Sequence, residues 1–265
     1  MAKLTRRSVL RGALLAAAGG VTALAGADQV KHWCGWDKPP VSGGYASAAD
    51  NLSVITNGGV QIHYFARTTE KLVALTFDDG PAPQWTPKFL DALDEAGVPA
   101  TFFLVGKNLE KHADLVRGRL DRHEVGNHSW SHTDLATLDL AKVRDELQRT
   151  HEAIGKYTGR TPKLLRPPFG HLGGSTVLAA DTMGYEIALW SHAMHEHRYA
   201  KDPAAQAKDI VDTVKPGSVI LAHDAGDSRR LVTLHALPAM ITGLQERGYR
   251  FVTASELFAA ASTAT

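Results

Sequence analysis

From Val54 onward, short apolar runs alternate with longer segments in which apolar residues recur every three to four positions. A short apolar run predicts a buried strand, and a period of 3.6 residues predicts an amphipathic helix. The predicted strands are residues 72–77, 100–105, 124–127, 164–166, 186–190, 219–222 and 250–252. The predicted helices lie near residues 86–96, 107–121, 140–155, 175–183, 203–214, 233–247 and 255–261.

The alternation of strands and helices favours βαβ units around a parallel sheet, which is the α/β class. Seven such units fit an incomplete or distorted barrel better than an open sheet, although periodicity alone does not separate the two. A chain of 265 residues has room for one large domain of this kind. In both architectures ligands gather at the carboxyl ends of the strands, so chemistry is expected there.

The first 27 residues have the pattern of an export signal. Arg6 and Arg7 precede an Ala/Gly-rich apolar run over residues 12–27, which ends in the small residues Ala25-Gly26-Ala27. This order is typical of a signal peptide of the twin-arginine type with cleavage after Ala27. The run is shorter than the ~20 residues that span a bilayer, which disfavours a permanent anchor. We therefore expect contact with the export machinery and a secreted or cell-wall-associated protein.

The next segment, residues 28–50, is rich in Gly, Ser, Ala and Pro without an apolar period, and it is predicted to be a linker. The catalytic domain is then expected over residues 51–265. The single cysteine, Cys34, lies before that domain, so neither an intrachain disulfide nor a cysteine-rich zinc site can form. A net charge of +1 gives no indication of a nucleic-acid partner.

Two of the predicted strands end in residues that could bind a metal. Asp78 and Asp79 in TFDDGP follow the first strand, and His128 and His132 in HSWSH follow the third. Histidines at i and i+4 share one face of a helical turn, and two His with one carboxylate form a three-ligand catalytic site. A polar turn and surface histidines are the plainer alternatives. His123-Glu124 does not begin an HExxH motif, because the next His is one residue too far.

Two further strands also end in ionisable side chains. Arg166 is followed by Pro167 and Pro168, which hold a fixed charge rigidly and could allow a bidentate pair with a carboxylate. His223 stands at the tip of the apolar run in LAHD. Unrelated turn residues would rarely place ionisable groups at the ends of four strands.

Taken together, TFDDGP, HSWSH, RPPFG and LAHD resemble in order and spacing the polysaccharide deacetylases of carbohydrate esterase family four. The resemblance covers roughly residues 72–257 and implies a distorted (β/α)7 barrel in a single catalytic domain. It also implies a metal-dependent hydrolase that removes acetyl groups from N-acetylglucosamine-type residues of a polysaccharide such as peptidoglycan or chitin oligomers.

The resemblance assigns a role to each motif. Asp79, His128 and His132 would bind one divalent metal, usually zinc, with cobalt or another divalent ion as alternatives. Asp78 would be the general base toward a metal-bound water, and Arg166 would keep Asp78 ionised and oriented.

The remaining roles concern the leaving group and the substrate. His223 would be the general acid, and Trp190 and Leu221 would form the pocket for the acetyl methyl. The backbone N–H of Phe169 would help to hold the oxyanion, with Phe replacing the Tyr that the family usually has. Pro167, beside it, is also expected at the substrate.

One segment departs from the family pattern. After Trp190 the family usually places an Asp, thought to tune the catalytic His, and a Trp, where this chain has Glu196 and His197. The departure concerns substrate preference more than chemistry. The three histidines 192, 195 and 197 could form a second metal site, but a polar loop is the favoured interpretation.

Other functions remain open at this stage. An acetyl-xylan esterase would use the same residues on an ester, a non-catalytic member would bind glycans, and a third alternative is a hydrolase of small amides. The sequence identifies neither the polymer nor the physiological metal, and a monomer is expected.

Overall fold

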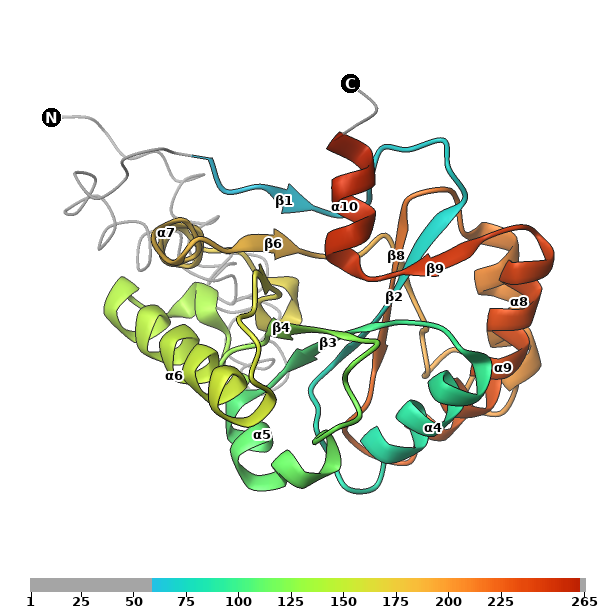
Figure 1. Cartoon of the computed structure of the whole chain (residues 1–265), viewed down its shortest axis with the longest axis horizontal. Coiled ribbons are helices and arrows are strands. Elements are labelled where there is room, and N and C mark those ends of the chain that lie inside the picture. The colour runs from blue at the N-terminus through green and yellow to red at the C-terminus, as the bar shows by residue number, and fades with distance from the viewer. Residues whose placement is uncertain (1–58, 263–265) are drawn as a thin grey trace, which may run out of the picture. The chain divides into compact units, whose positions relative to one another are not determined.

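The strands of residues 59–262, the part of the chain that the computed structural model describes, form one parallel sheet with helices around it (Figure 1). The predicted signal peptide and linker therefore lie outside the described residues. The strands are β1 (Ile62–His63), β2 (Leu72–Asp78), β3 (Thr101–Leu104), β4 (Glu124–Asn127), β5 (Leu164–Leu165), β6 (Glu186–Ala188), β7 (His192–Ala193), β8 (Ser218–His223) and β9 (Arg250–Val252).

Their spatial order is β1-β6-β5-β4-β3-β2-β8-β7, and β9 pairs with the first half of β2. Within the described residues every strand pair is parallel, and no ladder joins β1 to β7. The α/β class and the incomplete barrel that the pattern predicts are thus confirmed.

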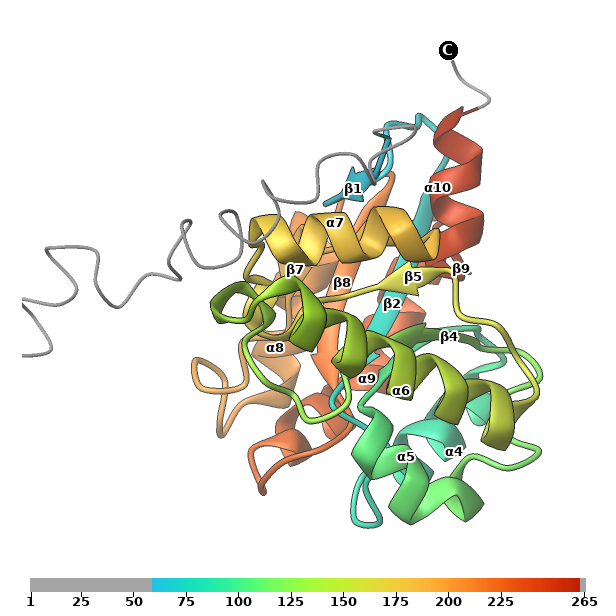
Figure 2. The same ribbon diagram turned by 90° about the vertical axis from the view of Figure 1, so that its left-hand side faces the viewer.

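The helices are α4 (Thr86–Ala96), α5 (Gly106–His112), α6 (Leu140–Thr158), α7 (Gly174–Met183), α8 (Pro203–Thr213), α9 (Arg230–Glu246) and α10 (Ala254–Ser262), with short 3-10 turns at Ala113–Leu115, Leu135–Thr137 and Pro168–Gly170. Helices α4 to α9 lie outside the sheet, as two perpendicular views show (Figures 1 and 2), and α10 packs against the apolar cluster inside it. The helix predicted over 107–121 was too long, since α5 ends at His112. Gly118 has a left-handed φ of 71°, which breaks the pattern beyond it.

None of the helices between residues 59 and 262 is both long and apolar enough to cross a membrane.

Alternation along β2 separates two environments. Val73, Leu75 and Phe77 belong to the largest core cluster, which packs against the surrounding helices. Leu72 and Ala74 point the other way and belong to a second cluster inside the curled sheet, which α10 lines with Leu257 and Phe258. Side chains in a strand alternate between faces, so the next inward positions are Thr76 and Asp78. The interior is therefore apolar at the amino end of the strands and polar at the carboxyl end.

Candidate active site

The turn after β2 separates two adjacent carboxylates. Asp78 ends the strand and is 3% exposed, facing the interior. Asp79 follows with a left-handed φ of 77°, and its side chain is 25% exposed at the rim. Asn108 in α5 donates an Nδ2–H to the carbonyl of Asp79 at 2.8 Å and fixes this turn. The abrupt change of backbone direction lets one carboxylate serve the interior and the other the surface.

The segment His128–His132 is a loop and not the helical turn that the i, i+4 spacing predicted. Ser129 and His132 have left-handed φ values of 64° and 59°, which no α-helix contains. Asn127 Oδ1 accepts a hydrogen bond from the Ser129 N–H at 3.0 Å, and Glu146 Oε2 accepts one from the Ser131 N–H at 2.8 Å. These side chains stabilise a tight reversal, and the reversal brings the two imidazoles together.

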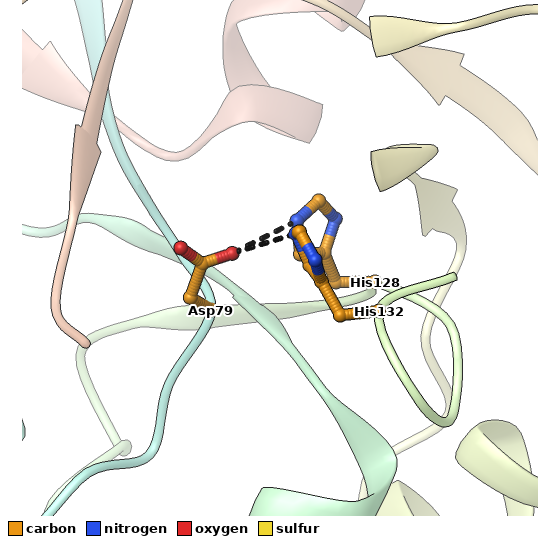
Figure 3. A group of neighbouring side chains, drawn as sticks. All are labelled: Asp79, His128 and His132. Carbon is orange, nitrogen blue, oxygen red and sulfur yellow. Dashed lines mark ion pairs between the residues drawn. The ribbon is translucent and has the colours of Figure 1, made fainter. Parts of the chain in front are cut away.

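Asp79, His128 and His132 converge on one point (Figure 3). Asp79 Oδ1 lies 3.4 Å from His128 Nε2 and 3.0 Å from His132 Nε2, and the three ligand atoms lie within 4.8 Å of one another. His128 Nδ1 lies 2.6 Å from the carbonyl of Arg166, so it carries the proton and leaves the Nε2 lone pair for a cation. One carboxylate and two imidazoles fit the usual donor set of a catalytic zinc site.

The electrostatics of this group also favour a cation. Burial alone raises the pKa of Asp79, but the His128 and His132 imidazoles bring it well below its usual range. Burial lowers the pKa of His128, while Asp78 and Asp79 together raise it above the ordinary value. Asp79 Oδ1 is buried and has no hydrogen bond. An ionised oxygen that has no hydrogen bond and faces two ring nitrogens is the arrangement that a divalent ion completes.

Arg166 follows β5 and is fully buried inside the sheet. Its Nη1 donates to Asp78 Oδ1 at 2.7 Å and to Thr76 Oγ1 at 2.8 Å, while its Nε and Nη2 donate to the carbonyls of Ala188 and Leu189. The bidentate pair suggested by the sequence is therefore wrong, because backbone carbonyls occupy the other prong. The single bond leaves Asp78 Oδ2 directed at His128, whose Nε2 lies 3.7 Å away.

His223 ends β8, where it is the register partner of Asp78 on the neighbouring strand. Its side chain is 27% exposed, and its Nδ1 lies 3.6 Å from Glu196 Oε1. Burial raises the pKa of Glu196, but His223 and the charge of Arg230 lower it to about 2. An ionised carboxylate thus faces Nδ1 of the His223 imidazole.

The segment 191–198 contains the two-residue strand β7, which the sequence did not predict. His192 Nδ1 lies 3.1 Å from Ser191 Oγ, and His197 contacts Arg229. Between residues 59 and 262 only Asp79, His128 and His132 are grouped as metal ligands would be. The second metal site that the three histidines suggested has no support.

The predicted substrate residues lie along the same rim. Pro167 precedes the 3-10 turn Pro168–Gly170, in which Phe169 has a left-handed φ of 62° and is 58% exposed. The Phe169 ring lies 4.9 Å from the His132 ring. A Cβ at Gly170 would come within 2.7 Å of Trp190, so this glycine is what lets the indole pack against the turn. Leu221 lies in β8, two residues before His223, and is 7% exposed.

Two neighbours of the site were assigned no role from the sequence, although Asp224 is the last residue of LAHD. Arg230 in α9 reaches both Glu196 and Asp79. Asp224 is fully buried beneath the rim, where Thr86 Oγ1 donates to its Oδ2 at 2.5 Å. Burial and the nearby Asp79 charge raise the pKa of Asp224 to about 7, against the Thr86 hydrogen bond. Both residues act through contacts between distant segments.

Comparison with known proteins agrees with this geometry. The polysaccharide deacetylase family profile matches residues 65–188. A peptidoglycan-N-acetylglucosamine deacetylase of Bacillus cereus is 35% identical over 191 residues, covering 71% of this chain and 88% of the relative.

Two solved structures share the fold. A peptidoglycan N-acetylglucosamine deacetylase in complex with an N-hydroxybenzamide ligand matches with a TM-score of 0.70 and 33% identity, covering 74% of this chain and 92% of the other. A family 4 acetyl xylan esterase from Clostridium thermocellum, in complex with a cobalt ion, matches with a TM-score of 0.66 and 35% identity, covering 71% and 91%. The incomplete barrel is thus of the type found in these enzymes.

Proposed function

The chain belongs to the polysaccharide deacetylase family, and we propose that it hydrolyses the N-acetyl groups of N-acetylglucosamine residues in a polysaccharide, with peptidoglycan or chitin oligomers as the substrate class. The enzyme is accordingly a hydrolase of carbon–nitrogen bonds other than peptide bonds. The observation that carries the proposal is the group formed by Asp79, His128 and His132, with Asp78 on one side and His223 on the other.

Asp79, His128 and His132 would hold a divalent ion, most simply zinc. When bound, such an ion lowers the pKa of a water toward ~7 and polarises the acetyl carbonyl. Asp78 accepts the proton of the attacking water at Oδ2, because Arg166 holds Oδ1. Burial of the Arg166–Asp78 pair keeps bulk water from screening that contact.

His223 donates a proton from Nε2 to the leaving nitrogen as the C–N bond breaks and acetate departs. Its Nδ1 faces Glu196 Oε1 at 3.6 Å, so Nε2 is the ring nitrogen left to face the substrate. The Phe169 N–H stabilises the oxyanion, and Trp190 and Leu221 contact the acetyl methyl. Pro167 fixes the start of the turn that carries Phe169.

The test is acetate release from chitin oligomers, peptidoglycan and acetylated xylan, each with and without chelator. We expect chelator-sensitive release from at least one N-acetylated glycan. No release from any of the three would contradict the proposed activity, and glycan binding would then be measured separately.

A second candidate is O-deacetylation of xylan, which the similarity to the acetyl xylan esterase favours. Attack on an ester requires the same base and the same acid, so the site geometry permits both reactions. Release from acetylated xylan at a higher kcat/KM than from the N-acetylated glycans would favour the esterase.

We also propose export by the twin-arginine route, which is supported by Arg6-Arg7 and the apolar run behind them. Replacing both residues with Lys is expected to retain the protein in the cytoplasm, as measured by fractionation. Unchanged export of that variant would contradict the route.

A further inference from the structure

Arg230 lies between the metal group and His223, the two sides of the site. Its Nη1 is 2.8 Å from Glu196 Oε1, and its Nη2 is 3.8 Å from Asp79 Oδ2. Its Nε donates to the carbonyl of Ala225 at 2.6 Å. Three nitrogens of one guanidinium therefore contact three separate segments, and the planar fork of arginine makes such simultaneous contacts possible.

The position of Arg230 runs against the usual preference of helices. It is the first residue of α9, and the first turn of α9 contains no acidic residue. A cation at the amino end of a helix faces the positive end of the helix dipole, which disfavours it. Glu196 and Asp79 supply the negative charges that offset this cost. The positive charge of Arg230 is thus stabilised by the carboxylates of the site and not by the dipole of its own helix.

The surrounding backbone holds this side chain in place. Gly226 has a φ of 118°, and a Cβ there would lie 3.1 Å from Arg230 Nε. Trp85 donates its Nε1–H to the carbonyl of Gly226 at 2.8 Å, which anchors the loop between β8 and α9. Only 18% of the Arg230 side chain is exposed. Its fork is therefore oriented before any substrate arrives.

One oxygen of Glu196, Oε1, contacts both Arg230 and His223. The same oxygen lies 2.8 Å from Arg230 Nη1 and 3.6 Å from His223 Nδ1. Arg230 therefore determines where the carboxylate stands relative to the imidazole. The other terminal nitrogen of Arg230, Nη2, faces Asp79 Oδ2, the oxygen that does not face His128 and His132.

We propose that Arg230 is a positioning residue that couples the metal side of the site to the acid side. One prong orients the carboxylate of the ligand Asp79, and the other fixes Glu196 so that His223 presents Nε2 to the leaving group. This inference rests on the proposed function for its kinetic half, while its metal-binding half is independent of the substrate. Partners that orient metal ligands typically contribute 10–100-fold to metal affinity or activity.

The test compares Arg230→Ala with Arg229→Ala. Arg229 is adjacent in sequence, but it pairs with the exposed Asp227 and contacts His197, and it has no ion pair with Glu196 or Asp79. Each variant is measured for zinc affinity, by competition with a fluorescent chelator, and for kcat and KM on an N-acetylated glycan. Arg230→Ala is expected to lose roughly 10–100-fold in kcat and to bind zinc more weakly, with KM nearly unchanged. Arg229→Ala is expected to match the wild type in kcat and in zinc affinity.

Two further variants test whether Arg230 acts by contacting Glu196 and Asp79 simultaneously or only through its positive charge. Glu196→Gln is expected to lower kcat but to leave zinc affinity unchanged, because Glu196 touches only the acid side. Arg230→Lys keeps the charge without the fork, so it is expected to remain impaired in kcat. The double variant Arg230→Ala with Glu196→Gln should lose little more kcat than Arg230→Ala alone, since residues of one unit are not additive.

A loss of fold would appear as a lower melting temperature, and the milder Arg230→Lys then provides the measurement. An active wild type with Arg230→Ala equal to Arg229→Ala in both kcat and zinc affinity would overturn the inference. An inactive wild type would instead overturn the proposed function. In that case zinc affinity still decides the metal half, which is wrong if Arg230→Ala binds zinc as the wild type does.

Discussion

On the metal side of the site the His128 side chain is 2% exposed, and its Nδ1 lies 2.6 Å from the carbonyl of Arg166. On the acid side the His223 side chain is 27% exposed, and its Nδ1 lies 3.6 Å from Glu196 Oε1, with no hydrogen bond formed. One imidazole is fixed within the polar end of the interior, whereas the other stands at the rim with a looser partner.

This difference matches the proposed roles of the two imidazoles, metal ligand for His128 and general acid for His223. A metal ligand must keep one orientation, and a buried hydrogen bond to a backbone carbonyl provides it. A general acid must exchange its proton with substrate and solvent in every cycle, which requires access to the rim. We therefore expect substitutions on the metal side to affect stability or metal binding as well as turnover, and those on the acid side to affect turnover alone.

The largest effect is expected from His128→Ala. It removes an imidazole whose Nδ1 proton is held by the Arg166 carbonyl and whose Nε2 would bind the ion. The variant should therefore lose the ion, and its activity should be lost with the ion. Zinc content after gel filtration and acetate release are the measurements, and activity should fall to that of the chelated wild type. A variant that retains a full equivalent of zinc would remove His128 from the ligand set.

Asp78→Asn should retain the ion but lose roughly 10²–10⁴ in kcat, because the amide cannot accept the proton. It also leaves the buried Arg166 without its counter-charge, which is expected to cost roughly 3 kcal/mol of unfolding free energy. Kinetics and thermal melting measure the two effects. Full activity would show that Asp78 is not the base, and an unchanged melting temperature would show that the ion pair is not important for stability.

His223→Ala should lose a similar factor of roughly 10²–10⁴ in kcat while retaining both zinc and melting temperature. The contrast with Asp78→Asn is what distinguishes the two sides, since the exposed imidazole leaves no buried charge behind. A drop in melting temperature as large as that of Asp78→Asn would contradict the comparison.

The smallest effect is expected from Asp224, a buried residue next to His223, and it concerns the pH dependence of stability. A Cβ at Gly80, the residue after Asp79, would come within 2.3 Å of the Asp224 carboxylate. Because the folded pKa of about 7 exceeds the reference value of 3.8, the folded state binds this proton more tightly. The resulting stability is fully present below about pH 4 and is lost as pH rises through about 7.

The chelated wild type should therefore melt at a lower temperature at pH 8 than at pH 5.5, and Asp224→Asn should reduce that difference. His128, whose pKa is also raised, contributes in the same direction in both proteins. Asp79 and Glu196 have lowered pKa values, so their contributions are already complete above pH 5. The exposed Asp227→Asn serves as the control and should leave the difference unchanged. An Asp224→Asn variant with the wild-type pH dependence would contradict the assignment.

Much of the fold could be predicted because local patterns determine it. The strands at Glu124–Asn127 and Arg250–Val252 and the helix at Thr86–Ala96 have the predicted bounds. The strands Ile62–His63 and His192–Ala193 were not predicted, because each contains a His and neither forms an apolar run like Leu164–Leu165. The sequence alone also left open whether the parallel sheet curls into a barrel.

At the site, the sequence predicted which residues meet but not how they meet. The spacing of His128 and His132 lets both imidazoles face Asp79, yet a loop stabilised by Glu146 brings them together and not a helix. Arg166 contacts Asp78 through one nitrogen because carbonyls from the β6 region occupy the others. Arg230 belongs to the site only through contacts across segments far apart in the chain.

The most direct test of the account is a zinc titration of the chelated protein with acetate release followed at each addition. Activity should rise in proportion to zinc and stop rising at one equivalent per chain, and Asp79→Asn should show no such rise. Acetate release without any divalent ion, or a rise that continues to a second equivalent, would contradict a single ion held by Asp79, His128 and His132.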